Sequence, residues 1–316
     1  MWKTAIIKPL PKVPTPTQPK EYRPIAMTSC LSKILEKLVK HYICQHTTLD
    51  PLQFAYRQGR STQDAVLQLV TTITDCIDAK AGNISRCLFL DFSSAFNTIN
   101  VEFLTQRLGH LDPKVSNWVA SFLQSRVQYT KTNDALSKKL ITNTGTPQGT
   151  VLSPLLFSIY TDSIRSQEFN VTILKYADDT VIIGNIAAHD DFSKYLSEIS
   201  RITNLCKAND LLLNASKTNE VIFSTQKALP DVTHLTLDST EIIPSESVKY
   251  LGVEIDNKLR FEDHIDAKVS KARQRLYLVK QFKFLGASDR FLNQIFSAFV
   301  ESCFFYCLVV IFCNLY

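Results

Sequence analysis

Residues Thr172 to Gly184 constrain the fold of this 316-residue chain more than any other stretch. Two apolar runs, Thr172–Leu174 and Thr180–Ile183, flank a short polar centre that holds Asp178 and Asp179. Runs of this kind, separated by a few residues that include Asp, predict the two strands of a hairpin. Such a hairpin would carry two adjacent carboxylates at its tip, where their like charges repel unless a cation lies between them. The alternative is a solvated turn, because Asp is a favoured turn residue.

The composition is that of a globular protein, with 45% apolar and 21% charged residues. A chain of this length is expected to form two or three packed subdomains. The net charge of +5 is unevenly spread: residues 1–60 carry ten Lys or Arg against three acids, and residues 258–283 carry eight against three. Two basic regions separated by a near-neutral stretch of sequence are suited to binding a polyanion between them. The alternative is that these Lys-rich helix faces are only solvated.

The eight cysteines show neither a CxxC pair nor a Cys/His cluster with zinc spacing. No signal peptide is recognisable, so the sequence predicts a reducing intracellular setting with free thiols. The apolar run from Cys303 to Cys313 is shorter than the roughly 20 residues that span a bilayer. It predicts a buried terminal helix and no membrane segment.

The first half of the chain reads as an extended, proline-rich segment over residues 8–24, followed by helices and one buried strand. Apolar residues between Leu31 and Tyr42 recur at helical spacing, with the lysines off the apolar stripe. Ser61 and Asp64 form a helix-start signature. Further predictions are a strand at Cys87–Leu90 and helices over 101–109 and 113–125.

The second half mixes short strands and helices without a regular βαβα alternation, which favours an α+β fold. A loop at Thr144–Pro154 runs into a helix. The remaining predictions are a hairpin of Val127–Thr132 with Leu136–Thr142 across Asn133-Asp134, helices over 192–206, 262–284 and 288–302, and strands at Val221–Ser224, His234–Leu237 and Val248–Ile255.

Asp91, Asp178 and Asp179 share one property: each stands at the end or tip of a strongly apolar strand. If those strands are neighbours in one sheet, the three carboxylates converge. Such a cluster is suited to two Mg²⁺ ions, which take hard oxygen ligands and stabilise the attacking and leaving oxygens of a phosphoryl displacement. The alternative is three unrelated strand-end acids.

Three ordered motifs carry a resemblance to a known family. They are Leu90-Asp91-Phe92-Ser93-Ser94-Ala95-Phe96-Asn97-Thr98-Ile99, then Gly145-Thr146-Pro147-Gln148-Gly149 with Ser153-Pro154, then Tyr176-Ala177-Asp178-Asp179. In this order they resemble the palm motifs of reverse transcriptases, in the variant of non-LTR (LINE-type) retrotransposons of the jockey/CR1-like kind. Supporting matches are Pro9-Leu10-Pro11-Lys12, Tyr22-Arg23-Pro24-Ile25, Gln53-Phe54-Ala55-Tyr56-Arg57, Leu213-Asn214-Ala215-Ser216-Lys217-Thr218 and Tyr250-Leu251-Gly252-Val253. The resemblance covers residues 2–300.

The resemblance implies an α+β right-hand polymerase, with fingers, palm and the start of a thumb, and an antiparallel palm sheet backed by helices. It places the fingers region at 1–84, the palm at 85–257 with residual fingers elements within 110–145, and the start of a truncated thumb at 258–316. The implied activity is RNA-directed DNA polymerase, using two Mg²⁺ ions with Mn²⁺ as an alternative. The implied partners are an RNA template, a DNA primer and dNTPs, in the cytoplasm and nucleus.

The same resemblance implies catalytic roles for four residues. Asp91, Asp178 and Asp179 match the residues that hold the metal ions, although Asp179 matters less to direct ligation in many relatives. Lys217 matches a lysine proposed to protonate the leaving pyrophosphate as a general acid. The alternative for Lys217 is a solvated lysine in a turn.

Two basic residues match positions that contact the triphosphate of the nucleotide. A guanidinium such as that of Arg23 engages phosphate oxygens in bidentate fashion. The alternative for Arg23 is a surface ion pair with the nearby Glu21. Lys12 is expected to do similar work from the proline-rich loop.

The resemblance also implies that Phe96 lies under the sugar and excludes a 2′-hydroxyl, which disfavours an RNA-synthesising polymerase; its alternative role is core packing. Gln148 and Gly149 match the loop near the incoming nucleotide, where a side chain at position 149 would crowd the ligand.

Residues Tyr250, Leu251 and Gly252, with Val253, resemble the primer-grip hairpin. The basic helix over 262–284 resembles the start of the thumb, which contacts the backbone of the template–primer duplex without reading its sequence.

The resemblance is incomplete at both ends of the chain. Relatives of this kind begin with an endonuclease domain, which is expected in the intact element and not found in this sequence, and the thumb is expected to continue beyond Tyr316. The chain is therefore interpreted as a fragment or as a truncated element copy. A nucleic-acid-binding remnant that does not polymerise productively is the alternative function, and the sequence does not decide the oligomeric state.

Overall fold

The computed structural model describes residues 3–80, 83–133, 135–187, 192–226 and 234–313. These residues form two units, each with its own internal packing. The first unit comprises Met1–Gln58, Asp91–Gln167 and Glu198–Asn214, and the second comprises Gly59–Leu90, Glu168–Ser197 and Ala215–Tyr316. Because the chain crosses between the units several times, neither unit is a continuous stretch of sequence.

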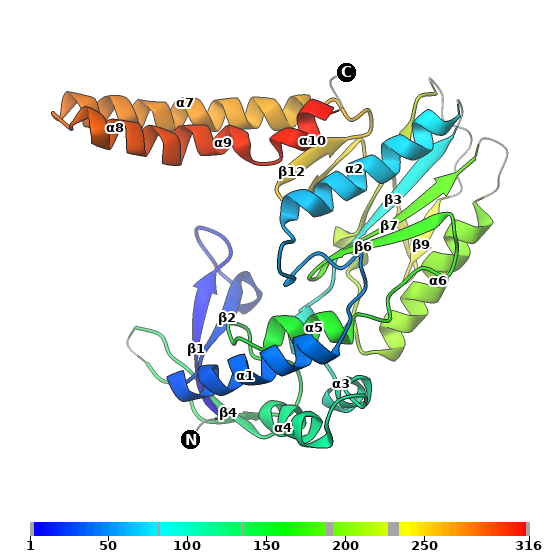
Figure 1. Cartoon of the computed structure of the whole chain (residues 1–316), viewed down its shortest axis with the longest axis vertical. Helices are drawn as coiled ribbons and strands as arrows, with labels where there is room; N and C mark the ends of the chain where they lie inside the picture. Colours follow the sequence, from blue (N-terminus) through cyan, green and yellow to red (C-terminus); the bar gives the residue numbers. More distant parts are fainter. Residues whose placement is uncertain (1–2, 81–82, 134, 188–191, 227–233, 314–316) are drawn as a thin grey trace. The chain divides into compact units, whose positions relative to one another are not determined.

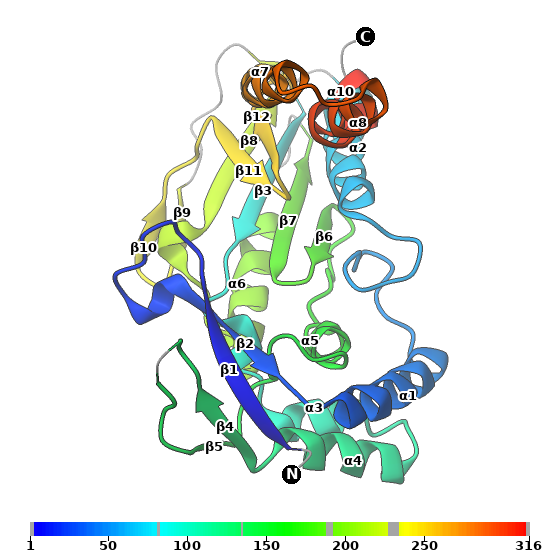
Figure 2. The same ribbon diagram turned by 90° about the vertical axis from the view of Figure 1, so that its left-hand side faces the viewer.

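An antiparallel four-stranded sheet is the centre of the second unit, with strand order β6-β7-β3-β8 (Figures 1 and 2). Its strands are β3 (Ile84–Leu90), β6 (Val171–Tyr176), β7 (Asp179–Ile186) and β8 (Asn219–Ser224). Every residue of β3 is buried, including the polar Ser85 and the charged Arg86, as expected for a central strand covered on both faces. The predicted run Cys87–Leu90 is therefore the second half of a longer strand.

Helix α2 (Thr62–Ala79) packs on this sheet and begins at the predicted signature. The Ser61 side chain accepts a hydrogen bond from the Asp64 amide, and the Asp64 carboxylate accepts one from the Ser61 amide, so the two residues form a capping box. The apolar residues of this helix face the core: Ile77 is half-buried, and the buried ones are Ala65, Val66, Leu69, Val70 and Ile73.

The first unit contains a second four-stranded sheet, with order β2-β1-β4-β5 (Figure 2). Strand β1 (Thr4–Pro11) pairs antiparallel with β2 (Tyr22–Met27) and parallel with β4 (Arg126–Thr130), which pairs antiparallel with β5 (Leu140–Thr142). The predicted hairpin of the last two strands is confirmed, with Asp134 of its turn outside the described residues. The unit also contains α1 (Cys30–His46), α3 (Val101–Arg107), α4 (Pro113–Leu123), α5 (Ser153–Tyr160), and the 3₁₀ turns η1 (Pro19–Glu21) and η2 (Ala95–Asn97).

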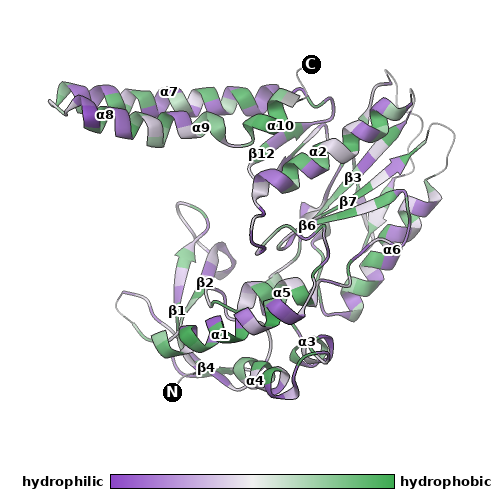
Figure 3. Cartoon of the chain, in the orientation of Figure 1, coloured by the Kyte–Doolittle hydropathy of each residue, from purple (hydrophilic) through white to green (hydrophobic). Residues whose placement is uncertain are grey.

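Helix α1 forms where the periodicity predicts it, but its buried face is not the apolar one. Leu31 is 73% exposed and Leu38 is 64% exposed, so the apolar stripe is not buried. Figure 3 shows that α1 carries both hydrophobic and hydrophilic residues. The buried face carries Glu36, whose carboxylate accepts hydrogen bonds from the amides of Val151 and Leu152 at the start of α5. These amides have no partner within their own helix, so satisfying them inside the protein outweighs burial of the apolar stripe.

The C-terminal part of the second unit contains two short hairpins and a group of helices. The elements are η3 (Ala215–Lys217), β9 (Leu235–Leu237), β10 (Thr240–Ile242), β11 (Ser247–Tyr250), β12 (Val253–Asp256), α7 (Glu262–Phe284), α8 (Asp289–Ile295), the π-helical η4 (Phe296–Glu301), α9 (Ser302–Phe305) and α10 (Leu308–Cys313). Helix α6 (Ser193–Ala208) begins in the second unit and ends in the first.

Two predictions in this region are wrong in detail. The run Val248–Ile255 is not one strand, because Leu251 and Gly252 adopt positive φ angles of 46° and 83° and turn the chain back on itself. The predicted terminal helix over Cys303–Cys313 is interrupted at Tyr306-Cys307, where Cys307 has a φ of 57°. Cys303 and Cys307 are buried as predicted.

The α+β class and the antiparallel sheet backed by helices are thus confirmed. The fingers, palm and thumb boundaries stay a prediction, since the two packed units follow a different division of the chain. The described cysteines carry free thiols. Among the described residues, no helix has both the length and the apolar composition needed to cross a membrane.

Candidate active site

Asp178 and Asp179 lie at the tip of the β6–β7 hairpin, as the sequence predicts. Tyr176 pairs with Asp179, which leaves Ala177 and Asp178 as a two-residue turn. Ala177 has a φ of 59°, a left-handed conformation that costs a residue with a Cβ atom about 1–2 kcal/mol. The paired strands on both sides hold the turn in this conformation, and both carboxylates are exposed.

Asp91 follows directly on β3, the strand that lies beside β7. In the register of these two strands Leu90 pairs with Thr180, the residue after Asp179. The chain therefore leaves β3 at the same end of the sheet as the Asp178–Asp179 turn. From Asp91 onward it belongs to the first unit, where the Asp91 carbonyl accepts a hydrogen bond from the Asn214 amide.

Among the described residues, no three His, Cys, Asp or Glu side chains are grouped as a ready-made metal site. The side chains of Asp178 and Asp179 offer adjacent, solvent-exposed oxygens, the donors that Mg²⁺ prefers. The assignment of Asp91, Asp178 and Asp179 as one set of metal ligands stays a prediction.

In the first unit, the basic residues of β1 and β2 share one face of the sheet. Leu10 pairs with Arg23 and Lys8 pairs with Ile25, and Lys12 continues the same alternation. The Lys12 ammonium donates a hydrogen bond to the Lys20 carbonyl at 2.9 Å, while the side chains of Lys8 and Arg23 are exposed. This face therefore presents positive charge to solvent.

The alternative explanation of Arg23 as an ion-pair partner of Glu21 does not hold. The Glu21 carboxylate accepts hydrogen bonds from the amides of Thr17 and Gln18 at 2.6 and 3.0 Å. These amides, that of Gln18 foremost, hold the pKa of Glu21 below its usual range. Within the described residues, Arg23 forms no ion pair with this carboxylate, so its guanidinium is available to a ligand.

The loop that contains Gln148 and Gly149 lies along the edge strand β2. The Gln148 carbonyl accepts a hydrogen bond from the Ala26 amide at 2.7 Å. Gly149 has a φ of +95°, and a Cβ atom at this position would lie 3.0 Å from Cγ2 of Ile25. The structure thus brings Gln148 and Gly149 to the strand of Arg23, and the close approach to β2 explains the glycine.

Phe96 is joined to the same loop through its backbone. Its carbonyl accepts a hydrogen bond from the Thr146 amide at 2.7 Å, and its ring stacks on Phe157 with centroids 4.7 Å apart. A Cβ atom on Gly145, whose φ is +74°, would lie 2.7 Å from the Asn97 carbonyl oxygen. The Phe96 ring therefore packs against Phe157, and any contact with a ligand would be an additional role.

The predicted primer-grip residues form the turn between β11 and β12. Tyr250 is buried and packs against Phe89 of β3 with ring centroids 5.5 Å apart. Burial, with the nearby charge of Asp179, raises the pKa of Tyr250 well above its usual range. Tyr250 thus links this hairpin to the Asp178–Asp179 turn within the second unit.

Tyr306 supports the turn between β11 and β12, a role that no sequence motif predicted. Its hydroxyl donates a hydrogen bond to the Leu251 carbonyl, and the Nζ of Lys268 lies 5.2 Å from the centre of its ring. A contact across 55 positions of sequence leaves no local signal. Lys217, by contrast, is exposed in the short turn η3, and its catalytic role stays a prediction.

A basic cavity of about 370 Å³ lies between the β11–β12 hairpin and the start of α7. Three lysines line it, together with the buried His264, whose Nε2 has no hydrogen-bond partner among the described residues. The lining residues are Lys249, Gly252, Glu254, Asp263, His264, Ala267, Lys268 and Lys271.

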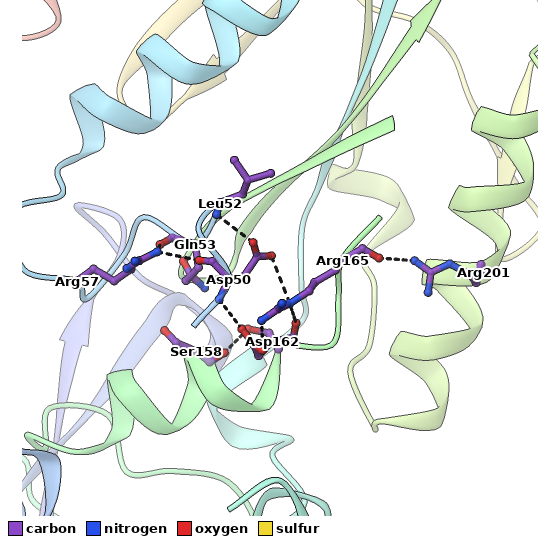
Figure 4. A network of polar contacts seen from close by, with 9 residues as sticks. Asp50, Leu52, Gln53, Arg57, Ser158, Asp162, Arg165 and Arg201 are labelled. Atoms are coloured by element: carbon purple, nitrogen blue, oxygen red, sulfur yellow. Dashed lines mark hydrogen bonds and ion pairs between the residues drawn. The ribbon is translucent and has the colours of Figure 1, made fainter. Parts of the chain in front are cut away.

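The Gln53–Arg57 motif builds a loop of the first unit, and Figure 4 shows the polar contacts of Gln53 and Arg57. Arg57 donates to the carbonyls of Asp50 and Gln53, and the Asp50 amide donates to the Asp162 carboxylate. Arg165 pairs with Asp162 at 2.5 Å. This motif is therefore explained by the folding of the first unit.

The family of the chain follows from comparison with known proteins. A family model described as reverse transcriptase (RNA-dependent DNA polymerase) matches residues 10–255, more than half of the chain. The chain belongs to the reverse transcriptase family. The expected resemblance to jockey-like non-LTR elements is also confirmed by its relatives.

Two of these relatives are from Drosophila melanogaster. The probable RNA-directed DNA polymerase from transposon BS is 27% identical over 289 residues, which cover 87% of this chain and 32% of the relative. The RNA-directed DNA polymerase from mobile element jockey is 28% identical over 282 residues, covering 84% of this chain and 30% of the relative. This reverse transcriptase chain thus spans about a third of the length of those proteins.

Solved structures support the fold. Telomerase from Candida tropicalis in complex with a fragment of telomeric RNA has a TM-score of 0.58 at 13% identity, covering 96% of this chain and 53% of the telomerase. The telomerase of Candida albicans has a TM-score of 0.54 at 12% identity, covering 81% of this chain and 46% of that one. The right-hand polymerase fold expected of a reverse transcriptase is confirmed.

Proposed function

We propose that this chain is an RNA-directed DNA polymerase that extends a DNA primer on an RNA template. The observation that carries the proposal is the Asp178–Asp179 turn, which presents two exposed carboxylates at the end of the sheet where β3 leads into Asp91. In a chain of the reverse transcriptase family, this arrangement suits phosphoryl transfer from a nucleotide.

Asp91, Asp178 and Asp179 would hold two Mg²⁺ ions, for which Mn²⁺ is an alternative. When bound, these ions would stabilise the charge on the attacking and leaving oxygens of the transferred phosphoryl group. The strained Ala177 turn fixes the direction of the two adjacent carboxylates before any ligand arrives.

The nucleotide would lie against the exposed basic face of β1 and β2. Arg23, with Lys12 beside it, would bind the triphosphate, and Gly149 would keep the loop close to the strand that carries Arg23. Gln148 would contact the same nucleotide from the adjoining loop. Phe96 would pack under the sugar and exclude a 2′-hydroxyl.

The template–primer duplex would lie along the β11–β12 hairpin and α7. Leu251 and Gly252 form the turn of this hairpin, and Tyr250 anchors it beside Asp179. Lys217 would act as the general acid that protonates the leaving pyrophosphate. The proposal includes an intracellular site of action, in the cytoplasm and nucleus.

Primer extension with purified chain tests this proposal. Wild-type protein is expected to extend a DNA primer on an RNA template with dNTPs and Mg²⁺, and Asp178→Asn is expected to abolish extension because it removes one carboxylate charge. Circular dichroism of both proteins controls for folding. Unchanged primer extension by Asp178→Asn would contradict the catalytic role of Asp178. If the wild type binds nucleic acid but incorporates no nucleotide in Mg²⁺ or Mn²⁺, the chain is better explained as a nucleic-acid-binding remnant.

The sugar-selectivity role of Phe96 has its own test. Phe96→Ala is expected to admit ribonucleotides, because it removes the ring that would fill the space of the 2′-hydroxyl. The measurement is the ratio of kcat/KM for dNTP and rNTP incorporation. Phe157→Leu is the matched control, since it alters the stack at 4.7 Å but leaves the Phe96 ring. Equal selectivity in Phe96→Ala and wild type would assign Phe96 to packing alone.

A further inference from the structure

A second cavity, of about 330 Å³, lies within the first unit between its sheet and the loop 144–148. Its described lining residues include seven with neutral hydrogen-bonding side chains and one cation, but none that is acidic. The lining residues are Ala5, Ile7, Pro24, Asn97, Arg126, Val127, Gln128, Thr130, Thr142, Thr144, Gly145, Thr146, Pro147 and Gln148.

This cavity lies on the opposite face of the sheet from Lys8, Lys12 and Arg23. In strand β1, Ala5 and Ile7 alternate with the residues of the basic face, and they pair with Gln128 and Thr130 of β4. The cavity is therefore separate from the exposed basic face to which the triphosphate is assigned above, although Gln148 lines it.

Arg126 is the only charged residue among those that line the cavity, and it is 3% exposed. Its guanidinium lies 4.6 Å from the centre of the Phe122 ring, and Nη1 donates to the Phe122 carbonyl at 2.9 Å. Nη2 is buried and has no hydrogen-bond partner among the described residues. Arg126 is thus held by one carbonyl and one ring, with donor capacity left over.

Arg126 also lacks a counter-ion within ion-pair distance among the described residues. Burial lowers the pKa of Arg126, and the charge of Glu36 opposes this shift. The Glu36 carboxylate is itself engaged, because it accepts hydrogen bonds from the Ser32 hydroxyl and from the amides of Val151 and Leu152. Glu36 therefore stabilises the guanidinium only at a distance.

A buried charge without a partner is costly, and proteins ordinarily pair such charges. The cavity can supply the missing partner by admitting an anion. A guanidinium with free N–H donors matches a phosphate group, and the threonine, asparagine and glutamine side chains around it can donate to further phosphate oxygens. The exposed Lys131, Lys138 and Lys139 on and beside the β4–β5 hairpin would favour the approach of a polyanion.

We propose that this cavity is a phosphate-binding site in which Arg126 pairs with the anion. The phosphate belongs either to the backbone of a nucleic-acid strand or to a nucleotide or pyrophosphate. The inference rests on the cavity and its buried cation, and it does not require that the chain polymerises.

The first experiment measures the melting temperature in EDTA, with pyrophosphate and with chloride at equal ionic strength. Pyrophosphate is expected to raise the melting temperature of the wild type, because a ligand that binds only the folded state stabilises it. Arg126→Gln is expected to lose this shift. Gln128→Phe keeps Arg126 and fills the cavity from the sheet face that it shares with Ala5, so it is expected to lose the shift too. Lys114→Gln, an equal loss of charge at an exposed position of α4 outside the cavity, is expected to keep it.

The second experiment identifies the source of the phosphate. Affinities for a labelled single-stranded RNA and for dTTP are measured in EDTA with the same four proteins. Loss of a charged hydrogen bond predicts a Kd about 10-fold to 100-fold higher in Arg126→Gln. If Arg126→Gln loses affinity for RNA alone, and the slope of its log Kd against log salt becomes shallower by about one phosphate contact, the bound phosphate belongs to a nucleic-acid strand. A loss confined to dTTP assigns a nucleotide phosphate.

Two results would overturn the proposal. One is a folded Arg126→Gln protein that keeps the pyrophosphate shift and both affinities. The other is an unfolded Arg126→Gln protein together with a Gln128→Phe protein that keeps the shift, which would leave Arg126 as a cap on the end of α4. Asp178→Asn is expected to keep the shift, so this proposal and the polymerase proposal fail separately.

Discussion

At the scale of single residues, His264 shows how burial fixes a protonation state. The side chain is 3% exposed, and its Nδ1 accepts a hydrogen bond from the Glu254 amide at 3.2 Å. Accepting this bond requires an Nδ1 without a proton. Burial, with Lys268 and Lys249 nearby, lowers the pKa of His264 below its usual value of 6.5.

A pH dependence of stability follows from the lowered pKa. When the pH falls below about 6.5, the unfolded chain binds a proton at His264 before the folded chain does. Stability is therefore complete above that pH and decreases below it, by at most about 1.4 kcal/mol per pH unit from this group. Urea unfolding at pH 7.5 and 5.5 measures the loss, and His264→Gln is expected to reduce it.

The matched control is His234, an exposed histidine that pairs with Glu241 at 2.8 Å. His234→Gln is expected to leave the pH dependence almost unchanged, because exposed ion pairs contribute little. Equal acid sensitivity of wild type and His264→Gln would contradict the assignment of a neutral, buried imidazole.

At the scale of elements, a buried ion pair joins β3 to β8. Arg86 donates from Nε and Nη2 to the two carboxylate oxygens of Glu220, each at 2.9 Å, and the Tyr195 hydroxyl donates to the same carboxylate at 3.0 Å. Arg86 and Glu220 are fully buried. Strand β3, which leads into Asp91, is therefore held to β8 by an ion pair that water does not screen.

Removal of one partner leaves the other charge buried and unpaired. Arg86→Met is therefore expected to lower the free energy of unfolding by about 3–5 kcal/mol. Replacement of both partners by apolar residues, as in Arg86→Met/Glu220→Leu, is expected to cost less than the single change. Urea denaturation of the wild type, of Arg86→Met, of Glu220→Leu and of the double variant checks this. A double variant as unstable as the sum of the single losses would show that the pair does not act as a unit.

The elements also show where sequence reasoning succeeds and fails. The β6–β7 hairpin and the α2 capping box were predictable, because their signals lie within a few adjacent residues. The face of α1 was not, because Glu36 is buried by amides more than 100 residues away, at Val151 and Leu152. Helical periodicity shows which positions of a helix are apolar. It does not show which backbone amides elsewhere in the chain need a hydrogen-bond acceptor.

At the scale of the whole molecule, the same distinction holds for the candidate site. The residues of the Asp178–Asp179 turn and the Gln148–Gly149 loop could be named from motifs, because each is a short contiguous stretch. Tyr306 and Arg126 could not, since Tyr306 acts on a turn 55 positions earlier and Arg126 matters because the described part of the chain gives it no counter-ion. Such features arise only once distant segments have packed.

The distribution of charge over the chain supports the last prediction. Lys271 is exposed and lines the cavity between the β11–β12 hairpin and α7. It belongs to residues 258–283, which contain eight basic and three acidic residues. If this surface holds the phosphates of a template–primer duplex, Lys271→Gln is expected to weaken binding of all sequences equally. The slope of log Kd against log salt should become shallower by about one phosphate contact.

The measurement is a salt titration of duplex binding by fluorescence anisotropy, with kcat at saturating duplex as a second readout. Because Lys271 would contact the backbone and not the reacting atoms, kcat is expected to change little while Kd rises. Lys114→Gln, which removes the same charge from an exposed position of α4, controls for the net charge of +5. Equal salt slopes for Lys271→Gln and Lys114→Gln would mean that net charge alone, and not the surface of α7, determines how this chain binds nucleic acid.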